Sequence, residues 1–337
     1  PDGQGSSPPE RPGGQTMRAI GVTEFGGPEV LRVVDLPDPE AGPGQLRIRV
    51  HAAAVNPTDT MLRDGARADR LKDVPPPHVP GMDVAGVLEQ IGPGVSTDLA
   101  VGDRVMAIVV PHGSHGAYSE RVVVPAESVV RVPAGATDAE AATLPMNGLT
   151  VRQALDLLGL ARGQTLAVTG AAGAVGGYAV QLAKAEGLRV VADASPADEA
   201  LVAELGADIV VRRGPDLAKN VRQALPDGAD GLIDGALLGQ AAADAVRDGG
   251  RIATLRGFVG EEVRGITFHP VWVREYAREQ EKLDRLRRQA EDGTITLRVA
   301  RTFPAERAAE AHDLLQAGGT RGRLVLELWS DRPSDQQ

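Results

Sequence analysis

A short glycine-rich turn constrains the fold of this chain more than any other feature of its sequence. The turn, residues 171–176, follows the apolar run 165–168 and precedes residues 178–184, whose apolar positions have helical spacing. Small residues let a backbone approach a phosphate closely, and the first N–H groups of a helix carry partial positive charge. The sequence therefore predicts a pyrophosphate-binding turn built from the backbone of four residues: Gly173, Ala174, Val175 and Gly176.

The segments after the turn continue an alternation of strands and helices. A helix is predicted at 200–205, and further apolar strands are predicted at 189–193, 209–211, 231–234 and 251–255. Strand, glycine turn, helix and strand form a right-handed βαβ unit, and repeated units form a doubly wound parallel sheet. We therefore predict an α/β fold with a Rossmann domain at 139–268, and favour this over an isolated structural turn.

The rest of the chain has a different pattern. At 337 residues the chain exceeds the usual size of one compact core, so two domains are expected. Residues 17–138 contain short strands separated by Gly and Pro, which predicts a twisted β-barrel, and residues 269–328 are expected to return to that domain. Residues 1–16 and 329–337 are predicted to be disordered extensions.

Charge and cysteine content exclude several classes of function. The formal net charge of −10 argues against a nucleic-acid partner, and no apolar run approaches the length of a membrane span. The chain has no cysteine, which excludes disulfides, a catalytic thiol and a thiolate-ligated zinc. These features and the absence of a signal-peptide pattern are consistent with a cytoplasmic protein, which is the location we expect.

Five groups of segments carry a resemblance to a known family. They are 55–59, 80–87 with 101–105, 144–150, 163–184 and 322–326. From residue 17 to residue 328, the chain is similar to zinc-independent members of the medium-chain dehydrogenase/reductase superfamily, and most similar to its quinone oxidoreductase-like group. The resemblance implies a GroES-like β-barrel domain beside the Rossmann domain, NAD(P)H bound in the cleft between them, hydride transfer to a small-molecule substrate, and a homodimer joined through Rossmann edge strands.

Departures from the zinc-dependent relatives predict a site without metal. Met82 and Asp83 follow Gly81, where the zinc-dependent proteins have Gly-His-Glu, and their cysteine is missing as well. A catalytic zinc needs three protein ligands, whereas His112 and His115 are interpreted as part of a loop near the cleft. Without a Lewis acid, hydride transfer is easiest to an acceptor that is already electrophilic, so we expect a quinone or an α,β-unsaturated carbonyl.

The end of the second Rossmann strand bears on the choice of nicotinamide. NAD enzymes place an acidic residue there, but by the spacing of the family that position falls on Ala194 and not on Asp193. Ser195, Arg212 and Arg213 would suit a 2′-phosphate, so NADPH is predicted. NADH bound through Asp193 stays open as an alternative, and so does the interpretation of the two arginines as solvated turn residues.

The resemblance also implies contacts with the nicotinamide half of the cofactor. The residues concerned are Asn56, Thr150, Leu255, Arg256, Gly257 and Arg323. Asn56 would also lie near the substrate oxygen, although it has the alternative role of a turn residue before a proline. Tyr118 is a candidate proton donor, with solvent as the alternative. Besides a reductase, two other functions stay open: a tailoring oxidoreductase for one secondary metabolite, and a non-enzymatic NADPH-binding protein.

Overall fold

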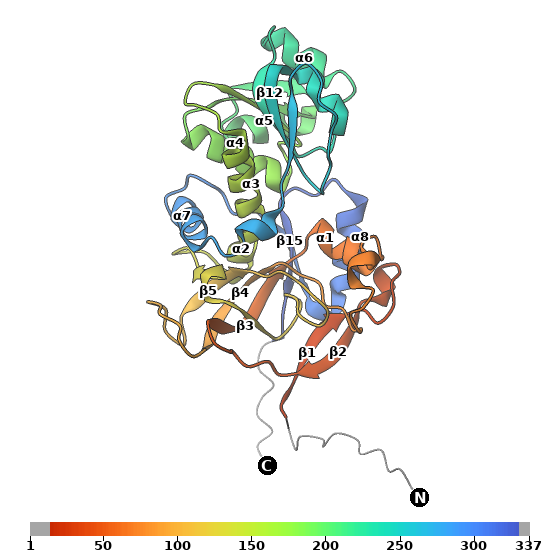
Figure 1. The fold of residues 1–337 in the computed structure, drawn as a ribbon, viewed down its shortest axis with the longest axis vertical. Helices are drawn as coiled ribbons and strands as arrows, with labels where there is room; N and C mark the ends of the chain where they lie inside the picture. Colours follow the sequence, from red (N-terminus) through yellow and green to blue (C-terminus); the bar gives the residue numbers. More distant parts are fainter. Residues whose placement is uncertain (1–13, 330–337) are drawn as a thin grey trace, which may run out of the picture.

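Two layered domains, one a β-barrel and one a parallel sheet covered by helices, are stacked along the long axis of the molecule (Figure 1). The structure is a computed structural model and describes residues 14–329. The predicted terminal extensions therefore lie almost entirely outside the described residues, except that Thr16 begins the first strand. Within the described residues, no helix is long and apolar enough to cross a membrane.

The barrel domain is built around a long strand whose side chains alternate between core and surface. Its seven-stranded sheet has the order β14-β15-β3-β4-β5-β7, with β6 also paired to β3, and β1 and β2 form a separate antiparallel pair. The strands are β1 (Thr16–Gly21), β2 (Arg32–Pro37), β3 (Gln45–Ala54), β4 (Asp83–Ile91), β5 (Arg104–Ile108), β6 (Arg121–Pro125), β7 (Val129–Arg131), β14 (Val299–Pro304) and β15 (Arg323–Glu327). In β3 the even positions from Leu46 to Val50 are buried, as a half-buried strand requires.

The upper domain contains a six-stranded, fully parallel sheet in the order β10-β9-β8-β11-β12-β13. Its strands are β8 (Thr165–Thr169), β9 (Arg189–Ala194), β10 (Ile209–Arg212), β11 (Ala229–Asp234), β12 (Val246–Thr254) and β13 (Thr267–Pro270). Numbered along the chain, this order is 3-2-1-4-5-6, the doubly wound arrangement of a Rossmann domain. The fold class predicted from the sequence is therefore confirmed, and β13 adds an edge strand that the sequence pattern did not indicate.

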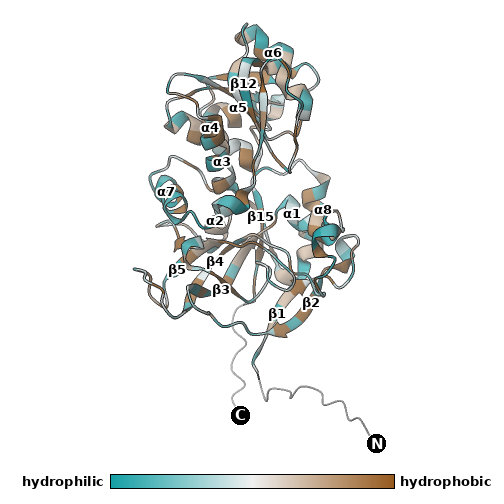
Figure 2. Ribbon diagram, viewed as in Figure 1, coloured by the Kyte–Doolittle hydropathy of each residue, from teal (hydrophilic) through white to brown (hydrophobic). Residues whose placement is uncertain are grey.

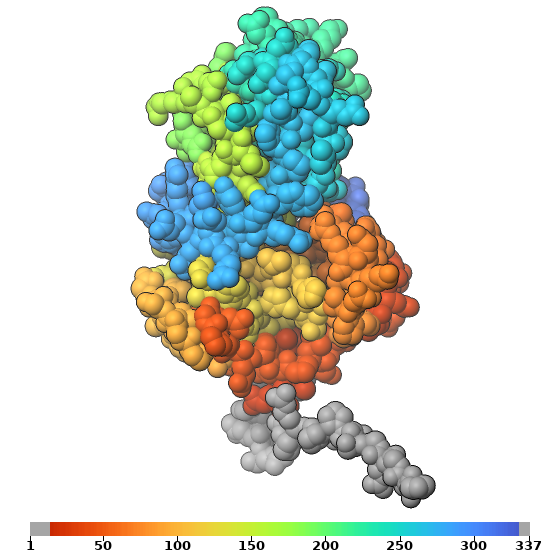
Figure 3. Space-filling model, in the orientation of Figure 1, coloured from red at the N-terminus to blue at the C-terminus, as the bar shows by residue number. Residues whose placement is uncertain are grey.

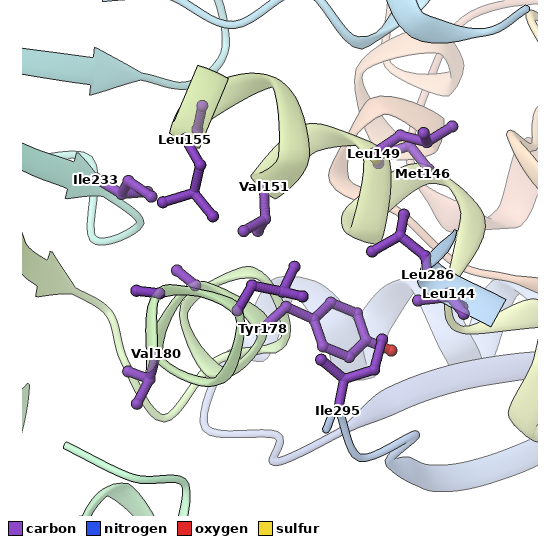
Figure 4. Close-up of a cluster of buried hydrophobic side chains, with 14 of the residues drawn as sticks. Leu144, Met146, Leu149, Val151, Leu155, Tyr178, Val180, Ile233, Leu286 and Ile295 are labelled. Atoms are coloured by element: carbon purple, nitrogen blue, oxygen red, sulfur yellow. The ribbon is translucent and has the colours of Figure 1, made fainter. Parts of the chain in front are cut away.

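Helices cover both domains and connect them. They are α1 (Pro57–Arg63), α2 (Asp138–Ala142), α3 (Pro145–Leu158), α4 (Ala174–Ala185), α5 (Glu199–Glu204), α6 (Leu217–Ala224), α7 (Gln280–Glu291) and α8 (Ala308–Ala317). Figure 4 shows Val151 of α3 and Tyr178 of α4 facing a shared apolar core, with Ile295 of the returning chain beside the tyrosine. This continuous core fixes the position of α4, and with it the position of the glycine turn.

The C-terminal segment returns to the barrel, as the resemblance implies. β15 pairs antiparallel with β3, with Val325 opposite Ala54. The charged segment 273–290, whose sequence predicts one long helix, is instead divided into a 3₁₀ turn, Val273–Tyr276, and the largely hydrophilic α7 (Figure 2). At the break, the hydroxyl of Ser128 donates a hydrogen bond to the carbonyl oxygen of Ala277 at 2.6 Å. This tertiary contact takes an acceptor that a continuous helix would use for its own ladder.

Candidate functional site

A cleft of about 760 Å³ lies where the two domains meet, at the carboxyl ends of β8, β11 and β12. In a doubly wound sheet this is the edge at which ligands bind, because the strand order reverses between β8 and β11. Figure 3 shows the segment after α1, in orange, lying close to the segment after β13, in blue, on one side of this junction. Both segments contribute residues to the wall of the cleft.

The glycine turn forms the part of the cleft wall that is best suited to phosphate. Gly173, Ala174, Val175 and Gly176, the residues predicted to hold the pyrophosphate, all line the cleft. Gly173 precedes α4 without a side-chain cap, and the first N–H groups of a helix have no partner inside it. A Cβ at Gly176 would lie 2.1 Å from the carbonyl oxygen of Gly170, so only glycine allows the helix to start this close to β8. The turn therefore fits a pyrophosphate held by backbone donors.

Side chains from distant parts of the chain support this turn. A carboxylate oxygen of Asp193, at the end of β9, accepts the N–H of Ala171 at 2.9 Å. The guanidinium of Arg298, just before β14, donates to the carbonyl oxygens of Gly173 at 3.0 Å and Ala172 at 3.4 Å. Arg298 was not predicted, because nothing near it in the sequence indicates that it meets a turn 125 residues earlier.

A second cavity of about 240 Å³ adjoins the other side of the turn, and it contains part of the predicted 2′-phosphate site. Ser195 and Arg213 line this cavity, together with Asp193. Arg212 lines neither cavity and lies 3.8 Å from Glu199 at the surface. The structure thus brings Ser195 and Arg213 together at this end of the cleft. Arg212 is left out, because it is the last residue of β10 whereas Arg213 follows the strand.

An ion pair in the second cavity was not predicted. Asp198 accepts a hydrogen bond from the Ser195 hydroxyl at 2.9 Å and pairs with Arg321 through two bonds of 2.8 and 2.6 Å. The hydrogen bonds from Arg321 hold the pKa of the Asp198 carboxyl below its usual range. Arg321 also lines the cavity, so the returning chain supplies a second guanidinium to this end of the cleft.

On the barrel side of the cleft, Asn56 and Arg323 form a buried polar network with Asp83, which is 3.3 Å from the Arg323 guanidinium. Arg323 donates to the side-chain oxygen of Asn56 at 2.6 Å, and Asn56 donates to Asp83 at 2.9 Å. Asp83 also accepts the backbone N–H of Met146 at 2.7 Å. Asn56 is 1% and Arg323 5% exposed, yet both line the cleft. These bonds fix the orientation of the Asn56 amide, so that one of its hydrogens goes to Asp83 and the other has no acceptor among residues 14–329.

Tyr118, the candidate proton donor, does not line the cleft. It is fully buried, and its hydroxyl donates to Asp59 at 2.9 Å and lies 3.0 Å from a ring nitrogen of His312. Asp59 in turn accepts the backbone N–H groups of Asn56 and Gly81. Burial raises the pKa of Asp59 to about 7, although these hydrogen bonds oppose the shift. We therefore revise the role of Tyr118 to that of a positioning residue for the turn that carries Asn56.

The remaining predicted residues divide into two groups. Thr150, Leu255 and Arg256 line the cleft, as the resemblance implies. Gly257 does not line it but lies beneath Trp272, because a Cβ there would come within 2.6 Å of the indole ring. Trp272 itself lines the cleft and was not predicted.

Comparisons with known proteins identify the family. Residues 42–134 match the family model described as alcohol dehydrogenase GroES-like domain, and residues 205–326 match that of zinc-binding dehydrogenase. The quinone oxidoreductase of Mus musculus is 30% identical over 340 residues, which cover 94% of this chain and 99% of that protein. This chain belongs to the medium-chain dehydrogenase/reductase superfamily, in its quinone oxidoreductase-like group.

Other members of the superfamily agree with this result. The chloroplastic NADPH-dependent alkenal/one oxidoreductase of Arabidopsis thaliana is 31% identical over 92% of this chain and 79% of that protein. The structure of the quinone oxidoreductase from Coxiella burnetii superposes with a TM-score of 0.82 at 29% identity, over 94% of this chain and all of that one. A mycobacterial structure complexed with NADPH has a TM-score of 0.79 at 32% identity, covering 92% of this chain and 100% of that chain.

The two histidines that were considered as metal ligands in the sequence help to close a loop. His112 and His115 form a pair of backbone hydrogen bonds, at 2.8 and 3.0 Å, that closes a tight loop. Only His112 of the two lines the cleft. In the described part of the chain, no three His, Asp or Glu side chains are grouped as metal ligands. Independence from zinc stays a prediction from the sequence.

Proposed function

We propose that this protein is an NADPH-dependent reductase that transfers a hydride, without zinc, to a quinone or an α,β-unsaturated carbonyl. One observation carries the proposal: an uncapped helix N-terminus and a buried Asn56–Arg323 pair face the same cleft from opposite domains. The first suits the phosphates of a dinucleotide, and the second suits a carbonyl oxygen that gains negative charge. The names of relatives that act on quinones and on alkenals support it.

The second cavity favours NADPH over NADH. The Arg213 guanidinium makes no side-chain hydrogen bond with the described residues, so its donors are available to a 2′-phosphate. Arg321 adds a second guanidinium, although Asp198 already engages it. NADH remains the second candidate because Asp193 lines the same cavity and a carboxylate there suits a ribose hydroxyl.

The barrel side of the cleft, with Asn56 and Arg323, would orient the acceptor. When NADPH is bound, its reduced nicotinamide supplies the hydride. The free amide hydrogen of Asn56 would donate to the acceptor oxygen. Arg323, which is paired with Asp83 at 3.3 Å, would hold the Asn56 amide in this orientation. Apolar walls at Met146, Leu255 and Trp272 limit the access of water to the reacting carbon.

The proton that completes the reduction would come from solvent. For an enone, a hydride adds to the β-carbon and a proton adds to the α-carbon, which leaves a saturated ketone and NADP⁺. Tyr118 is fully buried and its hydroxyl is already engaged by Asp59 and His312. The cleft, in contrast, opens to the surface between the domains.

The test is the oxidation of NADPH by the purified protein with a panel of quinones, 2-alkenals and enones. We expect turnover of several members of the panel, and a strong loss of kcat in Asn56→Ala. Tight binding of NADPH with no oxidation by any acceptor would contradict the proposal and would favour a non-enzymatic NADPH-binding protein. Activity confined to one complex substrate would instead favour a tailoring oxidoreductase.

The predicted homodimer would form at one edge of the parallel sheet. β13 is the edge strand of the parallel sheet, and the loop before it exposes Phe258, Val259 and Val263, the second of them at 72% exposure. An unpaired edge with exposed apolar residues is suited to pairing with a second copy. Light scattering should therefore give twice the monomer mass, and Val259→Glu should shift it towards the monomer. A wild-type monomer at micromolar concentration would contradict this proposal. The cytoplasmic location stays a prediction.

A further inference from the structure

Four arginine side chains in the wall of the cleft form no ion pair with an acidic residue of the range 14–329. They are Arg67, Arg70, Arg256 and Arg274. None of the four guanidinium groups forms a hydrogen bond or an ion pair with another residue in the range 14–329. No Asp or Glu from this range lines the cleft either. In a chain with a net charge of −10, acidic partners are plentiful, so four arginines without an ion pair on one wall are a specific feature of the cleft.

The four residues come from three separate segments that the fold brings together. Arg67 and Arg70 lie at a 3₁₀ turn after α1, Ala68–Leu71, and Arg274 lies in the turn Val273–Tyr276. The guanidinium of Arg70 is 5.9 Å from the ring centre of Trp272. The pKa of Arg67 is lowered first by burial and then by the charges of Arg70, Arg274 and Arg256, whereas the charge of Asp69 opposes the shift. Like charges along one cleft wall repel one another, and a bound anion would offset this repulsion.

The backbone at Arg256 gives a second, independent indication. Its φ of 54° lies in the left-handed region that non-glycine residues rarely adopt. Such a conformation costs free energy and is concentrated at binding and active sites. It occurs at the end of β12 and places an arginine in the cleft wall, next to Leu255.

The phosphates of the cofactor have other partners. The glycine turn faces the pyrophosphate position, and Ser195 and Arg213 lie in the second cavity, which contains none of the four arginines. The four instead line the larger cleft, together with Asn56, Met146 and Trp272, and Arg70 lies over the Trp272 ring.

We propose that the acceptor carries an anionic group, a carboxylate, sulfonate or phosphate, that binds this arginine cluster while its electrophilic carbon meets the nicotinamide position. This proposal rests on the proposed reductase function and specifies its substrate class. Guanidinium groups bind such oxyanions with charge-assisted hydrogen bonds, and several at one rim both attract and orient an anionic substrate. A neutral quinone would bind the same cleft without this contribution.

The test compares two acceptors that differ by one charge, 1,4-naphthoquinone and 1,4-naphthoquinone-2-sulfonate. In the double variant Arg67→Ala/Arg274→Ala, the ratio of kcat/KM for the sulfonated to the neutral quinone should fall by about tenfold or more, which corresponds to the loss of one charge-assisted hydrogen bond. Comparing this ratio between the variant and the wild type cancels the difference in electrophilicity between the two quinones. The matched control is Arg285→Ala, an exposed arginine of α7 that lines neither cavity, and it should leave the ratio unchanged.

Two further measurements distinguish an acceptor site from a cofactor site and from a failure of the reductase function. The dissociation constant of NADPH should be the same in the double variant and the wild type, and a parallel loss of NADPH affinity would assign the arginines to the cofactor and overturn the proposal. An unchanged ratio of kcat/KM would also overturn it. If neither quinone is reduced, the reductase function fails, and calorimetry with naphthalene-2-sulfonate then decides this proposal. Binding to the wild type but not to the double variant supports an anion site, whereas equal binding, or none, refutes it.

Discussion

Replacing Arg213 by alanine should weaken NADPH binding and leave NADH binding almost unchanged. Arg213 lines the second cavity beside Ser195 and has no competing side-chain hydrogen bond within the described residues, so a 2′-phosphate is the partner that its position suits. NADH lacks this phosphate and loses nothing when the guanidinium is removed. The variant therefore separates recognition of the phosphate from general binding of a dinucleotide.

The size of the effect follows from the kind of bond that is lost. A hydrogen bond between charged groups contributes about 1.5–3 kcal/mol, and about 1.4 kcal/mol corresponds to a tenfold change in affinity. Because the Arg213 side chain is exposed, solvent screens the interaction and the lower end applies, which predicts a loss of about tenfold for NADPH. Fluorescence titration of the purified protein with each nucleotide measures both dissociation constants.

The neighbouring arginine provides a matched control. Arg212 is also exposed and is the last residue of β10, but it lies near Glu199 and lines neither cavity. Arg212→Ala should keep the wild-type affinity for both nucleotides. Equal losses of NADPH and NADH affinity in Arg213→Ala, or an equal loss of NADPH affinity in the two variants, would refute the assignment of the phosphate to Arg213.

Three other substitutions test the turn and its surroundings. Gly176→Ala places a Cβ 2.1 Å from a backbone carbonyl oxygen, so we expect NADPH binding to be lost in titrations. Denaturant unfolding should show a stability lower by about 1–3 kcal/mol. Wild-type affinity for NADPH would contradict this. Tyr118→Phe should keep turnover but destabilise the protein by about 1.5–3 kcal/mol at pH 8. The loss should be smaller at pH 5, because Asp59, with its pKa raised to about 7, is then protonated and needs the donor less; abolished turnover would restore Tyr118 as the proton donor. Gly257→Ala combines a φ of 75° with a contact to Trp272, and should raise KM for the acceptor in steady-state assays; an unchanged KM would show that the indole does not shape the cleft.

The features that sequence alone could predict are those encoded by neighbouring residues. The alternation in β3 and the spacing of small residues at 173–176 each depend on a few adjacent positions, so their local patterns were sufficient. The right-handed connection of βαβ units then favours a parallel sheet with helices on its faces. The family resemblance supplied Asn56, Thr150 and Arg323, which the structure places in the cleft.

Contacts between distant segments were beyond prediction. The support of the turn by Arg298 and the pairing of Arg321 with Asp198 depend on where the returning chain meets the Rossmann domain. The burial of Tyr118 depends on the packing of α8, which brings His312 to its hydroxyl. Such contacts are set by tertiary packing, and no periodic pattern in the sequence records them.

The most direct test of the proposed reduction follows the hydride itself. The protein should be incubated with 2-cyclohexenone and NADPH deuterated at C4 of the nicotinamide, separately for the two C4 positions, and the product analysed by mass spectrometry. Proposed hydride transfer places one deuterium at the β-carbon of cyclohexanone, where it does not exchange with water, from one of the two labelled forms only. Cyclohexanone that carries no deuterium from either labelled form would contradict a hydride-transferring enone reductase. The same holds if neither 2-cyclohexenone nor any other enone supplied is reduced.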